Sequence, residues 1–404
     1  MRRRLTWVGA TLALVAAAAL VACSTKYSSS DNGLIVVPSN SSAVMQSFSL
    51  DLSNGAVSQI NNVNGPPTDG IPGQVILDPA GANAYVIVSA NPAVLGSVTG
   101  IQVFPILSDG KLGTGSTPTA TPNPVAMAID SAGKFLFVAN SAGSAASGTI
   151  TVFSIGSAGS LTEVGSASLP IVTGGGVPSP SALAVTRTVY PQLYSFCSNG
   201  QTPPTTEYLY VTDFVNDVLL NYLVSSSGGL TLMATATGNG VVTGTGPNGV
   251  AIDPCNRFAF VANATSNNVS AYTICNNNST TSQGCQAQDF SLHPVGTPIA
   301  AGDTPGPIAV DAYGNFLYVV DTGSDQISAY RFGTATGALT AESISSTNIG
   351  PNSIAVRSDD TWVFVANATS GNLSQYAITL STGALTPATG PVVTFNTPTG
   401  VAVK

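Results

Sequence analysis

The residues with the clearest chemical potential are two pairs of aspartates, and three residues separate the members of each pair. The pairs are Asp213 with Asp217 and Asp321 with Asp325. Three asparagines end similar apolar runs elsewhere in the chain: Asn140, Asn263 and Asn367. Carboxylate and carboxamide oxygens gathered in one place suit Ca²⁺ or a hydroxyl-rich ligand. A protein or a carbohydrate is the partner that we expect for such a face.

The same oxygens have two other uses. Asp213 or Asp321 is a candidate general base for a hydrolase, in which a divalent cation such as Ca²⁺ can activate the attacking water. Alternatively, each Asp or Asn accepts hydrogen bonds from its own loop as an Asx-turn. We favour the turn interpretation, in which these side chains only stabilise the fold and the sequence supports no firm metal site.

The elements that must position these residues form a repeat. Each copy has a Gly or Pro turn, a short Ala-rich strand, a polar turn and a bulky strand ending in Asn or Asp, as in residues 124–140 and 247–263. Seven copies align on the residue after the Ala-rich strand, at intervals of 46 to 67 residues: Asp78, Asp130, Thr186, Asp253, Asp311, Arg357 and Lys404. Propeller blades of roughly 40 to 50 residues with loop insertions give such intervals. The sequence therefore predicts an all-β, seven-bladed β-propeller of four-stranded antiparallel blades.

The pattern also predicts how the blades are placed. Alanine recurs in the first strand, where blades converge on an axis, and bulky residues such as Phe135 and Trp362 open the second strand. Residues 34–37 form a second strand without a first, whereas residues 399–403 form a first strand without a second. We expect the C-terminal strand to pair with the N-terminal blade, which closes the ring over residues 33–404 and removes an exposed edge.

Charge is divided between the two faces of this propeller. The paired aspartates and the three asparagines map to one end of the channel, here called the upper face. The basic residues of the propeller map to the opposite face or its periphery: Lys111, Lys134, Arg187, Arg257, Arg331, Arg357 and Lys404. A phosphorylated substrate would lack its usual cationic anchor on the upper face. The one histidine, His293, falls on an outer strand far from the axis.

The pattern of the first 22 residues predicts an export signal. Arg2, Arg3 and Arg4 precede an uncharged apolar run over residues 5–22 that ends at Cys23. This run resembles the lipobox of bacterial lipoproteins, with Cys23 lipidated and residues 23–32 as a Ser-rich tether. Residues 5–22 are also nearly long enough for a transmembrane helix. We expect a lipid anchor in the cell envelope, and Ser24 after the cysteine resembles sorting to the outer membrane of a Gram-negative bacterium.

Removal of this leader leaves 8 of the 11 Lys and Arg against 19 Asp and Glu, and this negative net charge disfavours nucleic acid as a partner.

Export changes the interpretation of the other cysteines, because disulfides persist outside the cytosol. Cys197, Cys255, Cys275 and Cys285 map to one face of two adjacent blades. A zinc site is the alternative, but paired CxxC spacing is absent. We expect two disulfides, with Cys275–Cys285 and Cys197–Cys255 as the preferred pairing among the possible ones.

With the strands Phe135-Leu136-Phe137-Val138-Ala139-Asn140 and Phe316-Leu317-Tyr318-Val319-Val320-Asp321 identified, the chain resembles the lactonase-type seven-bladed propellers. This is the 6-phosphogluconolactonase-like, YVTN-repeat family. The resemblance covers residues 33–404 and implies the fold. Enzymes of the family include 6-phosphogluconolactonases and muconate cycloisomerases, which use His, Arg and Glu near the channel mouth. Because His, Lys and Arg are missing from the upper face here, we expect a lipid-anchored binding or scaffolding module, and a lactone hydrolase is the alternative.

Overall fold

Short strands joined by Gly, Asn and Asp turns build the molecule, because its apolar runs are brief and rich in β-branched and aromatic residues. The computed structural model describes residues 32–60, 65–93, 96–143, 147–172, 174–188, 205–233, 240–276, 285, 290–388 and 396–404. Within them, 30 strands form seven antiparallel sheets, and residues Ser157–Gly159 form the 3-10 helix η1. The leader, the tether and Cys23 lie outside the described residues.

The sheets are numbered here as blades 1 to 7, and their strands A to D run outward from the axis. Blade 1 consists of β30 (Ala402–Val403), β1 (Asn32–Ser39), β2 (Val44–Asp51) and β3 (Val57–Gln59). Blade 2 consists of β4 (Ile71–Leu77), β5 (Asn83–Ser89), β6 (Gly100–Pro105) and β7 (Thr119–Ala120). Blade 3 consists of β8 (Pro124–Ile129), β9 (Phe135–Asn140), β10 (Thr149–Ile155) and β11 (Leu161–Ser168).

Blades 4 and 5 each carry one additional short strand beside strand C, and blades 6 and 7 have four strands. Blade 4 consists of β12 (Pro180–Val185), β13 (Glu207–Asp213), β14 (Val218–Val224) and β15 (Leu230–Leu232), with β16 (Val241–Val242) added, and blade 5 consists of β17 (Pro247–Ile252), β18 (Phe258–Asn263), β19 (Asn268–Ile274) and β20 (Leu292–Pro294), with β21 (Ile299–Ala300) added. Blade 6 consists of β22 (Pro305–Val310), β23 (Phe316–Asp321), β24 (Gln326–Phe332) and β25 (Leu339–Ser346). Blade 7 consists of β26 (Pro351–Val356), β27 (Trp362–Asn367), β28 (Asn372–Ile378) and β29 (Leu385–Pro387).

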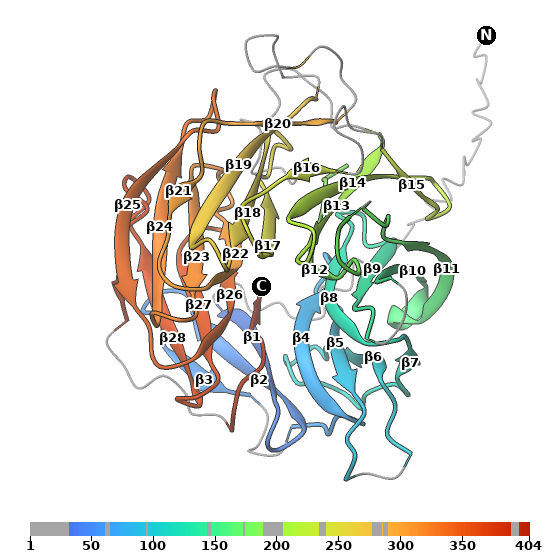
Figure 1. The fold of residues 1–404 in the computed structure, drawn as a ribbon. Helices are drawn as coiled ribbons and strands as arrows, with labels where there is room; N and C mark the ends of the chain where they lie inside the picture. Colours follow the sequence, from blue (N-terminus) through green and yellow to red (C-terminus); the bar gives the residue numbers. More distant parts are fainter. Residues whose placement is uncertain are drawn as a thin grey trace, which may run out of the picture.

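The sheets surround a central axis as a seven-bladed propeller, which confirms the predicted fold (Figure 1). The ring closes as predicted, because β30 pairs with β1 through the register Ile35↔Val403 and Val36↔Ala402. Two backbone hydrogen bonds between Leu34 and Lys404 flank this pair, at 2.9 and 3.1 Å. The C-terminal strand therefore supplies the innermost strand of blade 1 and covers an edge that would otherwise be open.

Small and large side chains alternate across the two inner strands. Ala128 faces Phe137, Ala251 faces Phe260, and the same pairing recurs at Ala184↔Tyr210, Ala309↔Tyr318 and Ala355↔Phe364. These aromatic side chains are fully buried. At these positions strands A, which converge on the axis, carry a small residue, and strands B fill the widening wedge.

Hydrophobic contacts run between blades as well as within them. Seven core clusters span the seven interfaces between adjacent blades, and each draws residues from both neighbours. In one of them, Phe260 of blade 5 packs with Leu317 and Tyr330 of blade 6. Each sheet is therefore covered on both faces, which explains why strand B is apolar without strict alternation.

One predicted disulfide is present. Cys275 and Cys285 are bonded, with their Cα atoms 5.3 Å apart, and the bond closes the loop between strands C and D of blade 5. Cys255 is buried in the neighbouring turn. Its preferred partner, Cys197, lies outside the described residues, so the second pairing stays a prediction.

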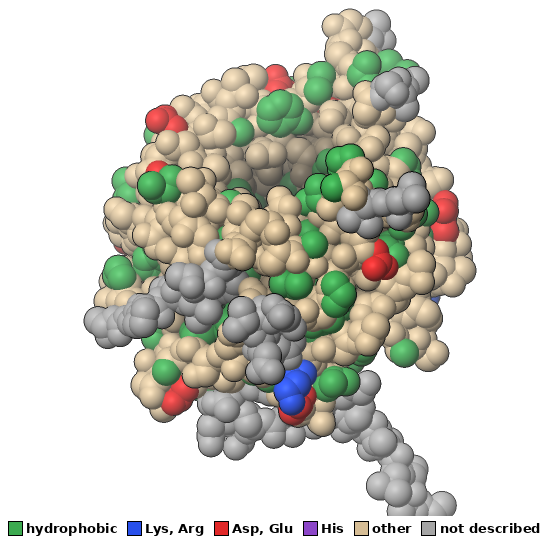
Figure 2. All heavy atoms as spheres, turned by 90° about the horizontal axis from the view of Figure 1, so that it is seen from below, with side chains coloured by type: hydrophobic (Ala, Val, Ile, Leu, Met, Phe, Trp, Pro, Cys, Tyr) green, Lys and Arg blue, Asp and Glu red, His purple; other side chains and the backbone are tan. Residues whose placement is uncertain are grey.

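The surface is largely uncharged, as expected for a chain in which only 7% of residues are charged. Figure 2 shows mainly hydrophobic and uncharged polar atoms on one side of the molecule, with scattered acidic and basic side chains. No helix in the described part of the chain is long and apolar enough to cross a membrane.

Candidate functional site

The strand B ends, which the sequence marks as candidate ligands, are buried inside their blades. Each is at most 1% exposed and lies opposite the proline that opens strand A: Asn140↔Pro124, Asp213↔Pro180, Asn263↔Pro247, Asp321↔Pro305 and Asn367↔Pro351. The five residues thus occupy one repeated position in the architecture.

The asparagines at this position bond to strand C of their own blade. The Asn140 Nδ2 donates to Thr151 Oγ1 at 3.0 Å, and the Asn263 Nδ2 donates to Ser270 Oγ at 2.9 Å. The Asn367 carboxamide contacts Ser374 at the equivalent place. These contacts tie the end of strand B to strand C of the same blade, which is an architectural role. The Asx-turn interpretation is wrong for the three asparagines, because their carboxamides bond to strand C and do not accept from the described backbone N–H groups of their own loops.

Asp213 caps a turn. Its Oδ1 accepts hydrogen bonds from the backbone N–H of Ser179 at 3.0 Å and of Val215 at 3.2 Å. Its Oδ2 accepts from Asn216 Nδ2 at 2.7 Å. The second aspartate of the pair reaches the next blade, because Asp217 Oδ1 accepts from the Gly246 N–H at 2.7 Å.

Asp321 makes different contacts at the same position. Its Oδ2 accepts from Ser328 Oγ at 2.6 Å and from Gln326 Nε2 at 3.2 Å, whereas its buried Oδ1 has no hydrogen-bond partner among the described residues. Burial raises the pKa of this carboxyl above its ordinary value. Asp325 Oδ1 accepts from the Gly350 N–H of the next blade at 2.8 Å.

The two aspartate pairs therefore serve their own loops and the neighbouring blade. The described part of the chain holds no group of three or more His, Cys, Asp or Glu that can ligate a metal. A Ca²⁺ site at Asp213, Asp217, Asp321 and Asp325 remains a prediction. So does a catalytic role for Asp213 or Asp321.

The upper end of the channel holds a cavity of about 460 Å³ that none of these seven candidates lines. Its polar lining consists of amides and hydroxyls: Gln74, Ser181, Asn248, Thr322, Asn352, Ser353 and Thr399. The remaining lining is apolar, and no Asp, Glu, His, Lys or Arg is part of it. The cavity can donate and accept hydrogen bonds but carries no charged side chain.

A β-bulge places four of these residues: Gln74, Ser181, Asn248 and Asn352. In each of blades 2 to 7 the register between strands A and B slips just after a proline at the start of strand A. The slip leaves Ser181, Asn248 and Asn352 without a partner on strand B. A bulged residue is re-aimed away from the ladder, here into the channel. The signal in the sequence is the residue after each strand A proline, which sequence reasoning did not single out.

Several lining groups also join adjacent blades. The Met127 N–H of blade 3 donates to Gln74 Oε1 of blade 2 at 2.6 Å, and Ser181 Oγ donates to the Pro247 carbonyl of blade 5 at 2.6 Å. Asn352 Nδ2 donates to the Pro398 carbonyl at 3.0 Å, and its Oδ1 has no partner among the described residues. These hydrogen bonds fix the orientation of the lining side chains relative to the neighbouring blades.

The lower ends of strands A carry a second set of aspartates, and these also cap turns. Asp311 Oδ1 accepts from the backbone N–H of Asn315 at 2.7 Å and of Phe316 at 2.8 Å. Burial raises the pKa of Asp311 from 3.8 to about 7, against the lowering effect of the Phe316 hydrogen bond, and the nearby Asp360 carboxylate also raises it.

This shift predicts a pH-dependent stability. A folded-state pKa above the unfolded value means that folding takes up a proton between those two pH values, so stability falls as pH rises toward 7. We expect the free energy of unfolding in urea to drop between pH 5 and pH 8, with an Asp311 contribution on the order of 3 kcal/mol. The Asp311→Asn variant should lose less over the same range. Equal losses in the two proteins would assign the pH dependence to other groups.

Comparison with solved structures shows the same fold. A candidate 6-phosphogluconolactonase of Bacteroides fragilis is 17% identical, with a TM-score of 0.69 over 93% of this chain and 98% of that one. The periplasmic gluconolactonase of Pseudomonas aeruginosa is 17% identical, with a TM-score of 0.69 over 92% and 99%. A protein of Lactobacillus plantarum is 20% identical, with a TM-score of 0.69 over 92% and 99%. At these identities the likeness concerns the fold alone.

Comparison with curated protein sequences found no match. The family model described as Lactonase, 7-bladed beta-propeller matches residues 20–404, which includes every described blade. The repeat, the closed ring of seven sheets and this match agree, and the chain belongs to the lactonase family of seven-bladed β-propellers.

Proposed function

We propose that the protein binds a small, uncharged, hydroxyl-rich molecule, such as an unphosphorylated sugar or sugar lactone, in the upper cavity. The observation that carries this proposal is the lining of that cavity, where amides and hydroxyls converge without an ionisable side chain. Such groups pair with the hydroxyls and ring oxygens of a sugar, which also both donate and accept hydrogen bonds. A phosphate dianion would find no cation there to offset its desolvation.

An exposed aromatic side chain, Phe214, favours the same class of ligand. Phe214 N–H donates to the Ser179 carbonyl, just as Thr322 N–H of blade 6 donates to the Thr304 carbonyl. The two residues therefore occupy equivalent places, and Thr322 lines the cavity. Phe214 is 40% exposed, and its place in blade 4 corresponds to a lining position of blade 6, so we propose that its ring offers an apolar face to the ligand. Ligand sites commonly combine such an aromatic face with a few directed polar groups.

Lactone hydrolysis is the second candidate function. It is favoured by membership of the lactonase family and by the name of the Pseudomonas relative, a gluconolactonase. Within the described residues, Asp321 is the group best placed to act as a base, because it precedes Thr322 of the cavity lining and has an unpartnered Oδ1. Asp321 is fully buried, however, which separates its carboxylate from a substrate in the cavity. Binding without turnover is therefore the leading proposal.

We further propose that this binding takes place in the cell envelope, because residues 1–22 have the pattern of an export signal. A lipid anchor at Cys23 would hold the propeller at a membrane, where a binding or scaffolding module can capture sugars outside the cytosol. The name of the Pseudomonas protein places that relative in the periplasm.

Calorimetric titration tests the proposal with D-glucose, glucono-1,5-lactone and glucose 6-phosphate as probes. We expect the two uncharged probes to bind and the phosphate to bind more weakly. Asn248→Ala should weaken binding about tenfold, because a hydrogen bond to the ligand is lost. Asn54→Ala, in an exposed turn at the outer edge of blade 1, is the matched control and should bind normally. Stronger binding of glucose 6-phosphate, or equal binding by both variants, would reject the upper cavity as a neutral sugar site.

The same material separates binding from hydrolysis. Acid release from glucono-1,5-lactone is followed with a pH indicator, and we expect no acceleration over buffer. Acceleration that disappears in Asp321→Asn, with an unchanged melting curve, would establish the hydrolase instead.

A further inference from the structure

The wall of the upper cavity is not polar on every side. Six blades, counting the segment that leads into β30 as part of blade 1, each contribute an amide or a hydroxyl to the lining: Thr399, Gln74, Ser181, Asn248, Thr322 and Asn352. Among the described residues, blade 3 contributes only Val125 and Ala126. These two residues form an apolar sector, in which the wall has no hydrogen-bonding side chain.

Val125 occupies the position that holds a polar side chain in three other blades. The register between β8 and β9 slips just after Pro124, as it does around Ser181, Asn248 and Asn352. The bulge that turns those polar side chains toward the channel therefore turns Val125 there as well. Val125 is 42% exposed. Apolar surface that is open to solvent favours a ligand that covers it with an apolar group.

Exposed apolar side chains continue beside this sector, at the upper end of blade 4. Phe214 of its B–C loop is 40% exposed, and Val177 of the segment that leads into β12 is 51% exposed. The loop and the segment lie together, because the Phe214 N–H donates to the Ser179 carbonyl at 2.9 Å. The same segment borders blade 3, because the Gly148 N–H, just before β10, donates to the Pro178 carbonyl at 2.8 Å. Apolar surface is thus present next to blade 3 as well as on it.

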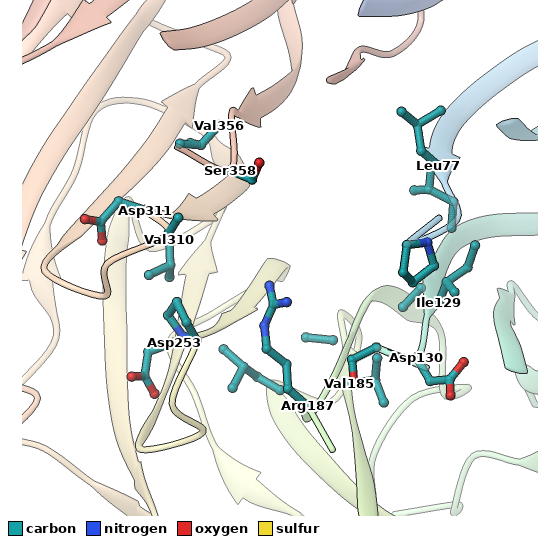
Figure 3. Close-up of a pocket in the computed structure, with 18 of the residues that line it drawn as sticks. Leu77, Ile129, Asp130, Val185, Arg187, Asp253, Val310, Asp311, Val356 and Ser358 are labelled. Carbon is teal, nitrogen blue, oxygen red and sulfur yellow. The ribbon is translucent and has the colours of Figure 1, made fainter. Parts of the chain in front are cut away.

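Charged side chains line the opposite end of the channel. A lower cavity of about 600 Å³ lies where strands A of blades 2 to 7 end, and it shares no lining residue with the upper cavity. Asp130, Arg187, Asp253 and Asp311 are among its lining residues (Figure 3). The combination of an apolar sector with an uncharged polar wall therefore belongs to the upper cavity.

We propose that the ligand of the upper cavity is a neutral sugar joined to an apolar group, as in an alkyl or aryl glycoside, and that this group lies against Val125. The inference rests on the proposed function and specifies its ligand. The amides and hydroxyls of the other blades pair with the sugar hydroxyls, and the apolar group covers the exposed surface of Val125. The cavity volume of about 460 Å³ falls within the roughly 300–1,000 Å³ of pockets that enclose drug-sized molecules, so it can hold more than a single sugar ring.

Calorimetric titration with methyl β-D-glucopyranoside and phenyl β-D-glucopyranoside tests the inference, because the two probes differ only in the apolar group. We expect the phenyl glucoside to bind at least about tenfold more tightly, since its ring is buried against Val125. In Val125→Ser, which places the side chain type of the equivalent blade 4 position in blade 3, the ratio of the two affinities should fall to about threefold or less.

Val164→Ser is the matched control for this substitution. Val164 lies on β11, the outer strand of the same blade, is 41% exposed and does not line the cavity. The affinity ratio of the unaltered protein should therefore persist in this variant.

NMR of isotope-labelled methyl groups in the unaltered protein gives a second readout that needs no variant. The phenyl glucoside should shift the methyl signals of Val125 more than the methyl glucoside does, because only its ring is aromatic. The signals of Val310, in the lower cavity, should stay in place with both probes. Equal affinities of the two glucosides, an unchanged ratio in Val125→Ser, or shifts confined to the lower cavity would overturn the inference. Methyl glucoside binding that weakens in Asn248→Ala would leave the sugar site standing in that case, whereas binding of neither glucoside would reject both proposals.

Discussion

Deletion of residues 397–404 should destabilise the propeller by about 5 kcal/mol or more, since it removes the buried Val401 and Ala402 side chains together with a whole inner strand. The β30 strand pairs with Ile35 and Val36 at the axis. Without it, the backbone groups of β1 that now bond to β30 lose their partners, and the clusters on both faces of blade 1 lose a member. Urea unfolding followed by circular dichroism measures the change.

A point variant distinguishes the stability contributed by the whole strand from that contributed by its last side chain. Lys404 Nζ donates to the Ala80 carbonyl at 2.8 Å, so Lys404→Ala removes one exposed contact and keeps the strand. We expect this variant to unfold at nearly the same urea concentration as the intact protein. A truncated protein that is as stable as the intact one would mean that ring closure contributes nothing to the fold.

Asp253→Ala is the single substitution with the largest expected effect on stability, a loss of about 3 to 5 kcal/mol. Asp253 is fully buried and accepts hydrogen bonds from the backbone N–H of Phe258 at 2.8 Å and from Arg257 Nε at 2.7 Å. The alanine variant leaves these donors unsatisfied and leaves the Arg257 guanidinium, 19% exposed, without its carboxylate. Removing one partner of a buried ion pair costs more than the pair itself contributes.

Asp109→Ala is the comparison for this prediction. Asp109 also pairs with a cation, Lys111, but both side chains are about half exposed, at 51% and 53%. Solvent screens such a pair, so we expect no measurable change in the urea midpoint. Similar effects of the two substitutions would show that burial does not govern the contribution of the Asp253 pair.

Much of the fold was predictable because it depends on local and repeated features. The aspartate after strand A caps the A–B turn wherever it occurs, so its recurrence identified the blades. The unpaired strands at the two ends of the chain predicted closure, since each lacked the partner that the other supplies. The Cys275–Cys285 disulfide closes a short loop and was expected on the same local grounds.

The candidate site was less predictable. Asp213 and Asp321 occupy the equivalent place in their blades, but Asp213 accepts from loop N–H groups, whereas Asp321 accepts from Ser328 on strand C. The difference follows from the facing residues of strand C, which are apolar in blade 4 and polar in blade 6. Whether such a carboxylate faces a ligand or its own sheet depends on those neighbours.

By itself, the sequence determined the class of fold and the number of blades, because each depends on residues close together in one repeat. Only the tertiary structure decided which side chains meet in the channel. Ser181, Asn248 and Asn352 come from three blades and converge because bulges turn them inward at the axis. The lower cavity is likewise lined by residues from six blades. These contacts depend on how segments far apart in the chain pack around the axis. The residue pattern within a single strand does not encode that packing.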